Sequence, residues 1–310
     1  MGMSKMFSTW TSKLILFNGL LALFIILWGA WVRLSGSGAG CGEHWPLCHG
    51  QVIPLSPSFK TIIELTHRLT SGIFGLTVLA QWYFAYKEYG KKHPQFWASM
   101  AFLIVTIIEA LIGAVLVKKG LVVDNSSALR AWVIGAHLVN TLLLLGVLAL
   151  CYSFLNIPMG LIRREVKSFE KYLTSIGLTL FLVVGAFGAI TALGNTLFPS
   201  EDLIQGMASD FDPQAPFLIR LRVYHPMMAV IMGILWIGLL VSWREKPDLG
   251  NLAQISLGLL FISLGFGVIN WLLMAPVWGA LIHLLLGDLL WMSVCTTSIH
   301  RFFLIPRNNA

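Results

Sequence analysis

The chain has 310 residues, of which 57% are hydrophobic and 11% are charged, and its mean hydropathy is +0.79. A soluble domain carries about 25% charged residues and could not bury this much apolar surface in one core. These values exclude a water-soluble globule and indicate an integral membrane protein in the lipid bilayer. The formal net charge of +7 is explained by loop charges and candidate anion sites, so nucleic-acid binding is not expected.

Eight apolar runs are each long enough for a membrane-spanning helix, which needs about 20 apolar residues. The sequence therefore predicts an all-α integral membrane protein with eight transmembrane helices. The first run continues into Arg33 and a glycine-rich loop without a small-residue cleavage site, so we interpret it as a retained helix and not as a signal peptide. In chain order the runs are Leu14–Val32, Ile62–Tyr86, Phe96–Val117, Ala131–Leu155, Tyr172–Leu193, Leu221–Trp243, Leu252–Leu273 and Trp278–Ile299.

The distribution of basic residues predicts the orientation. When alternate loops are assigned to opposite sides, 13 of the 21 Lys and Arg residues fall on the side of the two termini and eight on the other. The positive-inside rule then places both termini in the cytoplasm. The segment Met1–Lys13 is too short for an organelle transit peptide, which favours a bacterial cytoplasmic membrane.

The four cysteines fall into two groups. Cys41 and Cys48 lie in the first outside loop, where oxidising conditions allow a disulfide. Cys151 and Cys295 lie near the predicted cytoplasmic ends of the fourth and eighth spans. We expect this second pair to be reduced, structural thiols.

The chain shows signs of an internal duplication. The cytoplasmic segment 156–171 separates two sets of four spans, and each set has a histidine in its second and fourth span. Four spans return the chain to its starting side, so the second set has the same orientation as the first, as in a parallel repeat. The prediction is two pseudo-symmetric four-helix bundles, residues 1–155 and 172–310, joined by the linker 156–171.

The four repeated histidines are His67, His137, His225 and His283. Each lies four to six residues in from the outer end of its span, which at roughly 1.5 Å per residue is about 6–9 Å below the boundary. Ionisable groups are costly in the bilayer, so a repeated layer of them suggests a site. Histidines on facing helices of a bundle can supply both axial ligands of a haem, whereas zinc favours three or four ligands with thiolate or carboxylate.

This pattern predicts one porphyrin site per bundle, between His67 and His137 and between His225 and His283. Haem propionates would point outward, toward guanidinium groups that can pair with them. Snorkelling of these arginines to the membrane interface explains each of them equally well. The candidate propionate anchors are Arg33, Arg68, Arg130, Arg220 and Arg222.

The two bundles differ in their acidic residues. Glu64 precedes His67 by three residues and shares its helix face, whereas no acid precedes His225 in this way. The N-terminal bundle could therefore perform acid–base chemistry, and the C-terminal bundle could hold a haem and pass electrons. Glu109 and Asp288 also lie inside spans, and proton transfer and a buried hydrogen bond both stay open for them.

The run Gly38-Ala39-Gly40-Cys41-Gly42-Glu43-His44-Trp45-Pro46-Leu47-Cys48-His49-Gly50-Gln51, the motif Glu64-Leu65-Thr66-His67-Arg68 and the later single histidines resemble haem A synthase of the bacterial type with a cysteine pair in its first outside loop. The resemblance covers nearly the whole chain. It implies oxidation of the methyl group of haem O to a formyl group by successive oxygenations through an alcohol, which gives haem A.

By this resemblance, His67 and His137 would flank the substrate haem, with Glu64 as the catalytic carboxylate. His225 and His283 would ligate a resident haem b, and Cys41 and Cys48 would form a disulfide. Implied partners are a haem O synthase, the cytochrome oxidase assembly route and an electron donor for which quinol is one candidate. The sequence departs from some members, which carry a second cysteine pair between the fifth and sixth spans, because residues 191–220 contain none.

Other functions share the four histidines. A di-haem b cytochrome that takes electrons from quinol predicts two permanently bound haems, and a haem carrier predicts an exchangeable haem without catalysis. An ion transporter would use the histidines as proton relays. The cytochrome gives no reason for Glu64 to stand in one bundle alone, so the synthase is the preferred hypothesis. The sequence leaves the oligomeric state open, and a homo-oligomer is compatible with it.

Overall fold

The computed structural model describes residues 9–156 and 162–304, and long helices make up most of this part of the chain. Residues 157–161 of the predicted linker lie outside the described part, as do residues 1–8 and 305–310. The long helices are α2 (Trp10–Leu34), α3 (Phe59–Tyr89), α4 (Pro94–Lys118), α5 (Ala128–Ser153), α6 (Ser168–Leu197), α9 (Tyr224–Arg244), α10 (Gly250–Leu272) and α11 (Val277–Phe302).

Short elements complete the described chain. The 3-10 turn η1 (Phe154–Asn156) follows α5, and two-residue strands β1 (Ile162–Arg163) and β2 (Phe303–Leu304) pair in antiparallel register. Helices α7 (Leu203–Asp210) and α8 (Phe217–Arg220) lie between α6 and α9. The sequence predicted no helix in this connection.

Within the described residues, seven segments are long and apolar enough to cross a membrane. They are α2, α4, α5, α6, the segment Phe217–Arg244 that joins α8 to α9, α10 and α11. Large apolar side chains are exposed on the outer faces, as at Leu20 (73% exposed) and Ile234 (67% exposed). Such surfaces require a lipid environment, so the prediction of a multi-pass membrane protein is confirmed.

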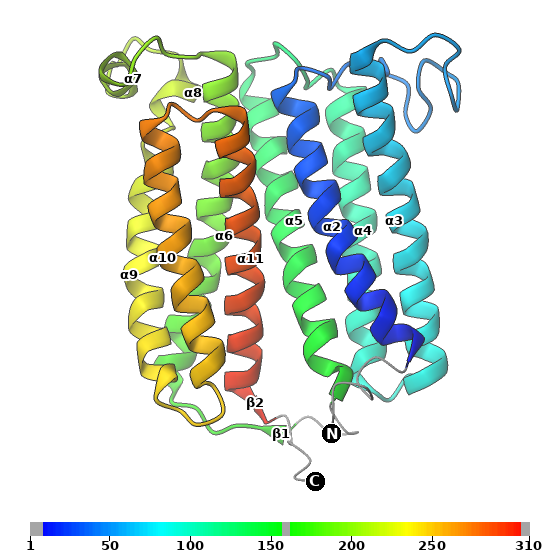
Figure 1. Ribbon diagram of the computed structural model, residues 1–310, viewed down its shortest axis with the longest axis vertical. Helices are drawn as coiled ribbons and strands as arrows, with labels where there is room; N and C mark the ends of the chain where they lie inside the picture. The colour runs from blue at the N-terminus through cyan, green and yellow to red at the C-terminus, as the bar shows by residue number, and fades with distance from the viewer. Residues whose placement is uncertain (1–8, 157–161, 305–310) are drawn as a thin grey trace.

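The second predicted span corresponds to α3, which is less apolar than these seven because it carries Lys60, Glu64, Arg68 and Gln81. Helix α3 nevertheless runs beside α2 and α4 along most of the height of the molecule (Figure 1). The sixth predicted span, Leu221–Trp243, is interrupted where α8 ends, and α9 begins at Tyr224. Pro226 then falls in the first turn of α9, where its missing N–H costs no helical hydrogen bond.

Side-chain caps position the starts of the first four long helices. Thr9, Ser58 and Ser127 accept hydrogen bonds from backbone N–H groups in the first turns of α2, α3 and α5. His93 does the same for α4, whose first residue is Pro94. These caps satisfy donors that have no partner within the helix.

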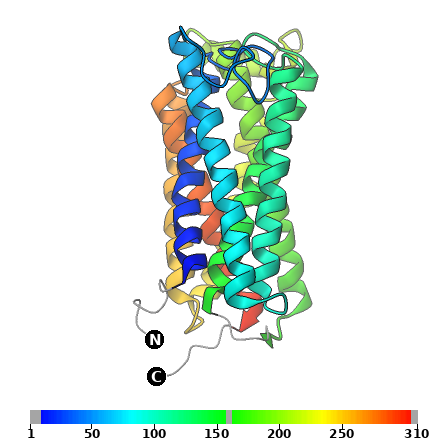
Figure 2. The same cartoon turned by 90° about the vertical axis from the view of Figure 1, so that its right-hand side faces the viewer.

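Neighbouring helices pack in two groups. In the first, α2, α3, α4 and α5 contact in chain order and α2 also contacts α5; in the second, α6, α9, α10 and α11 contact in order and α11 also contacts α6. Contacts of α5 with α6 and α11, and of α2 with α11, join the groups. Both views show α2 beginning and α11 ending at one end of the molecule, with the loop 35–58 and α7 at the other end (Figures 1 and 2).

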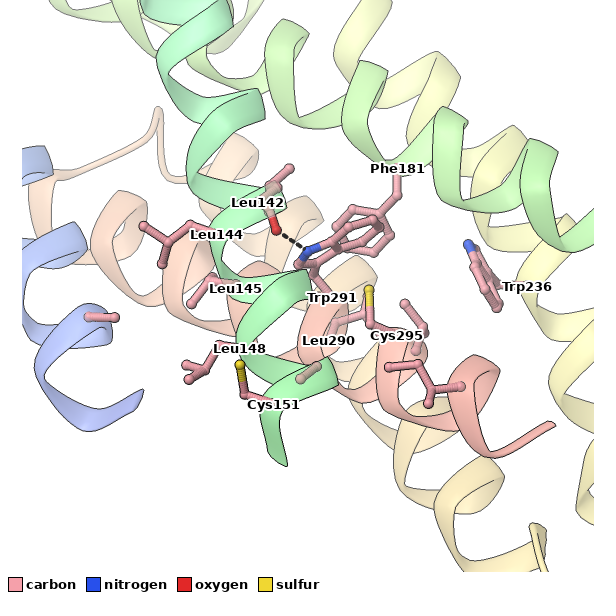
Figure 3. Close-up of a cluster of buried hydrophobic side chains, with 14 of the residues drawn as sticks. Leu142, Leu144, Leu145, Leu148, Cys151, Phe181, Trp236, Leu290, Trp291 and Cys295 are labelled. Carbon is pink, nitrogen blue, oxygen red and sulfur yellow. Dashed lines mark hydrogen bonds between the residues drawn. The ribbon is translucent and has the colours of Figure 1, made fainter. Parts of the chain in front are cut away.

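The core lies where the two groups meet. Trp291 of α11 donates its indole N–H to the carbonyl oxygen of Leu142 on α5 at 2.5 Å, and its ring packs on Phe181 of α6 with centroids 4.9 Å apart (Figure 3). Cys151 and Cys295 are free and buried in the same cluster. Their prediction as reduced, structural thiols agrees with this position.

Candidate functional site

Each of the four repeated histidines lies against a glycine of the preceding long helix in the chain. A Cβ atom built on that glycine would lie 2.9–3.0 Å from Cε1 of the imidazole at three of these contacts, and 4.0 Å from it at the fourth, which is Gly113. A methyl group would therefore displace the ring at the three close contacts. The pairs are Gly29 with His67, Gly113 with His137, Gly188 with His225 and Gly267 with His283.

In the C-terminal group, His225 of α9 and His283 of α11 face each other with ring centroids 6.2 Å apart and ring planes at 82°. Two metal–nitrogen bonds of about 2 Å, plus about 1 Å from each nitrogen to its ring centroid, add up to roughly 6 Å. The observed separation therefore fits one metal ion between the two rings.

The ring nitrogens of His225 and His283 are suitably placed to bind a metal ion. Nδ1 of His225 lies 3.0 Å from the carbonyl oxygen of Val184, which leaves Nε2 as the free nitrogen. A hydrogen bond from the other nitrogen to a backbone carbonyl is the usual support of a metal-ligating histidine. Nδ1 of His283 is buried and has no hydrogen-bond partner among the described residues.

In the N-terminal group, His67 of α3 and His137 of α5 are close enough to interact electrostatically, and the carboxylate of Glu109 also acts on His67. Nδ1 of His67 is buried without a hydrogen-bond partner in the described chain. The structure thus brings together the two histidines that the sequence assigned to one site.

Glu109 is a residue whose role the sequence left open. Its Oε1 lies 3.2 Å from Nδ1 of His137, an ion-pair distance without the alignment of a hydrogen bond. Its carboxylate also accepts hydrogen bonds from the Asn140 amide at 2.6 Å and from the Thr141 hydroxyl. The sequence signal for this contact was an acid in the middle of one span and polar residues on a neighbouring span. The sequence alone did not show that these residues are in contact.

Glu64 lies near the N-terminal end of α3 and is 3% exposed. Its Oε1 pairs with the guanidinium of Arg68 at 2.5 Å, and its Oε2 accepts the backbone N–H of Cys41 at 2.8 Å. Arg68 also donates to the carbonyl oxygens of His44 and Leu47. Glu64 and Arg68 therefore hold the first loop on the end of α3, and among the described residues Glu64 makes no hydrogen bond or ion pair with His67.

The first loop contains the disulfide Cys41–Cys48, and both cysteines are fully buried. The predicted cysteine pairing is confirmed. Gly40 lies so close to α3 that a Cβ there would be 2.4 Å from the carbonyl oxygen of Lys60. The absence of a side chain at this position lets the cystine approach Glu64.

Two of the candidate propionate anchors have free donors. Nη1 of Arg33 and Nε of Arg130 are buried without a hydrogen-bond partner in the described chain, while Nη1 of Arg130 donates to the carbonyl oxygens of Val123 and Asn125. The two guanidinium groups are close enough to repel each other. Paired cations with unsatisfied donors favour an anionic ligand.

The other three anchors differ from this pair. Arg68 is engaged by Glu64 and the first loop, as described above. Arg222 pairs with Asp210 of α7 at 2.7 Å and also donates to Asn195 and Ser209, so it joins α7 to α6. Arg220 is exposed at the end of α8.

Sequence comparison places these features in a family context. The profile of the COX15-CtaA family, described as cytochrome oxidase assembly protein, matches residues 12–295. A protein of Thermus thermophilus named protoheme IX farnesyltransferase is 42% identical over 282 residues, which are 90% of this chain and 45% of that protein.

Two further relatives are named heme A synthase. The Exiguobacterium protein is 38% identical over 143 residues, 44% of this chain and 46% of its own. The Alkalihalophilus pseudofirmus protein is 41% identical over 92 residues, 30% of this chain and 31% of its own. The chain thus spans less than half the length of each curated relative described here.

Proposed function

Because the chain belongs to the COX15-CtaA family of cytochrome oxidase assembly proteins, we propose that it is a haem A synthase, an oxidoreductase that converts the methyl group of haem O to the formyl group of haem A. The observation that carries this proposal is the asymmetry between two similar histidine pairs. The carboxylate of Glu109 lies 3.2 Å from Nδ1 of His137, whereas neither His225 nor His283 forms an ion pair with an acid in the described part of the chain.

The proposed architecture has eight transmembrane helices, with α3 as the eighth. Its course beside α2 and α4, and the start of α2 and end of α11 at one end of the molecule, support an even number of crossings. The matching contact order in the two helix groups and the four glycine–histidine pairs support two pseudo-symmetric bundles, residues 1–155 and 172–310, joined by 156–171. The charge distribution supports cytoplasmic termini in a bacterial cytoplasmic membrane.

We assign a resident haem b to the C-terminal bundle. His225 and His283 would be its axial ligands, because their centroid separation of 6.2 Å suits one metal ion between them. Haem b supplies one-electron redox chemistry when bound. The protein's contribution is to hold both rings in place through Gly188, Gly267 and the Val184 carbonyl.

We assign the substrate haem to the N-terminal bundle, between His67 and His137. Arg33 lies four residues beyond Gly29 and Arg130 seven residues before His137, which is about 6 Å and about 10 Å further toward the outer end. Their free N–H groups are suited to the two carboxylates of a porphyrin. This pair therefore takes precedence among the anchors, and Arg68, Arg220 and Arg222 are assigned lesser parts in propionate binding.

Glu64 is the proposed catalytic carboxylate. It can accept or release a proton, or stabilise positive charge, as the methyl carbon is oxidised. Its bonds to Arg68 and to the Cys41 N–H would keep it at the outer edge of the substrate site. The Cys41–Cys48 disulfide stabilises the loop segment that provides this hydrogen bond.

The name of the Thermus relative does not change this assignment. More than half of that protein lies outside the matched region, so its name does not assign prenyl transfer to the part that resembles this chain. The proposed partners are a haem O synthase as the supplier of substrate, the cytochrome oxidase assembly route as the recipient of product, and an electron donor for which quinol is one candidate. Self-association into a homo-oligomer is compatible with this role.

The proposal is tested by extracting haems from membranes that contain this protein together with a haem O synthase, and identifying them by chromatography. The intact protein should yield hydroxylated haem and haem A, and Glu64→Gln should lower both by at least about 100-fold, as loss of an acid–base group does. Glu43→Gln is the matched control, because Glu43 is an exposed acid in the loop 35–58 that packs on the Glu64 end of α3.

If membranes with the intact protein yield only haem B and haem O while both of its haem sites are filled, this result would contradict the proposal of a haem A synthase. It would favour a di-haem cytochrome instead. Haem O that exchanges freely without any oxidised product would favour a carrier.

A further inference from the structure

Glu109 connects α4 to α5 at the histidine that we assign to the substrate haem. Its carboxylate accepts hydrogen bonds from Asn140 and Thr141 and lies 3.2 Å from Nδ1 of His137. All three contacts come from one turn of α5. The carboxylate is therefore held from two sides in a fixed position beside the imidazole.

The C-terminal bundle has no counterpart to this arrangement. Glu109 precedes Gly113 by four residues, and the residue four before Gly267 is Ser263. The Nδ1 atoms of His137 and His283 both lack an aligned hydrogen-bond partner in the described chain, but only Nδ1 of His137 has a carboxylate within ion-pair distance. At the positions of Asn140 and Thr141, three and four residues after the histidine, α11 has Leu286 and Gly287.

A purely structural tie between two helices does not need a carboxylate. Serine, threonine and asparagine make such ties within membranes at lower cost, and Ser256 on α10 does so with Ser293 of α11 at 2.7 Å. A negative charge 3.2 Å from Nδ1 has a further effect: it favours the tautomer that carries its proton on Nδ1, and it makes the opposite nitrogen a stronger metal ligand.

We propose that Glu109 is a positioning residue that acts through His137, directing Nε2 toward the iron of haem O and strengthening it as a ligand in the substrate bundle alone. The proposal rests on the proposed function, because it assumes that haem O binds between His67 and His137. According to this proposal, the N-terminal haem site differs from the C-terminal one through Glu109 as well as through Glu64.

The test uses the full-length protein in lipid, with haem O added in increasing amounts and Glu109→Gln as the variant. Glutamine preserves the size of the side chain and can still bond Asn140 and Thr141, but it removes the charge at His137. We expect haem O affinity to fall about 10- to 100-fold, the usual effect of removing a group that supports a ligand, and the electron paramagnetic resonance signal of bound haem O to shift. Haem B content, measured after extraction, should be unchanged.

Two controls separate positioning from folding. Asp288→Asn alters another buried acid, on α11, and should leave haem O affinity unchanged. In a His137→Ala background, Glu109→Gln should cause no additional loss of affinity, because the residue through which Glu109 acts is gone.

Unchanged haem O affinity and an unchanged resonance signal in Glu109→Gln would overturn the proposal. It would also be overturned if Glu109→Gln lowered haem O affinity as much in the His137→Ala background as it does in the unmodified protein. Parallel loss of haem B and haem O would reduce Glu109 to a general structural role and would also overturn it. Failure of the unmodified protein to bind haem O would refute the proposed function itself, and the assignment of Glu109 with it.

Discussion

Replacing Gly267 by alanine tests the geometry of the C-terminal histidine pair. The new Cβ would lie 2.9 Å from Cε1 of His283, whereas carbon atoms in favourable contact are about 3.5 Å or more apart. The ring must therefore move by about 0.6 Å, which is about three times the tolerance of roughly 0.2 Å in metal–ligand distances.

The expected magnitude follows from the rotation needed to relieve this contact. Turning a side chain about 30° from its rotamer costs about 0.5–1.5 kcal/mol, and a tenfold change in binding corresponds to about 1.4 kcal/mol. Haem b affinity should accordingly fall about 2- to 12-fold. Gly265→Ala is the matched control, because a Cβ there meets no atom within 4 Å and alanine favours the helix.

The assay is the haem B content of purified protein, together with the rate at which apo-myoglobin removes the haem. Gly267→Ala should release haem faster than the unmodified protein, and Gly265→Ala should behave like the unmodified protein. If both variants retain haem as well as the unmodified protein does, the claim that Gly267 determines the position of the His283 ring is refuted. If both variants lose haem equally, the effect does not come from the specific contact of Gly267 with His283.

Three further predictions concern other parts of the structure. Gly29→Ala should weaken haem O binding more than Gly113→Ala in a haem O titration, because the new Cβ would be 3.0 Å from one histidine ring and 4.0 Å from the other; equal effects would contradict this. Arg222→Ala should lower the free energy of unfolding in detergent by about 1–3 kcal/mol, because it leaves Asp210 without its ion-pair partner; an unchanged denaturation midpoint would be evidence against that pairing. Cys41→Ser should lower the same free energy by about 2–3 kcal/mol, the value for closing a short loop, and reductant should destabilise the unmodified protein but not this variant.

Several features of the site could be predicted from the sequence because they depend on local pattern. The apolar runs predicted that His67, His137, His225 and His283 lie in four long helices, and they do, whereas their common depth in the membrane stays a prediction. The position of two cysteines seven residues apart in one loop allowed a disulfide, the family resemblance implied it, and it is present. The free, buried state of Cys151 and Cys295 also agrees with the prediction.

The arginines and Glu109 show the limit of this reasoning. Five arginines near the outer ends of spans were equivalent candidates for propionate binding, but the structure engages Arg68 and Arg222 in ion pairs and leaves buried donors free on Arg33 and Arg130. Glu109 was recognisable as an acid in mid-span, and its contact with His137, 28 residues later, was not.

The sequence by itself therefore determined the membrane environment, the long apolar helices, the repeated histidines and the cysteine pair, because apolar length and residue spacing act within one segment. Only the tertiary structure decided which glycine meets which imidazole, which guanidinium groups keep free donors and which carboxylate supports a histidine. These contacts join different helices, and helical periodicity defines the faces of a helix without determining its neighbours. The packing of α2 to α5 and of α6 to α11 determines them.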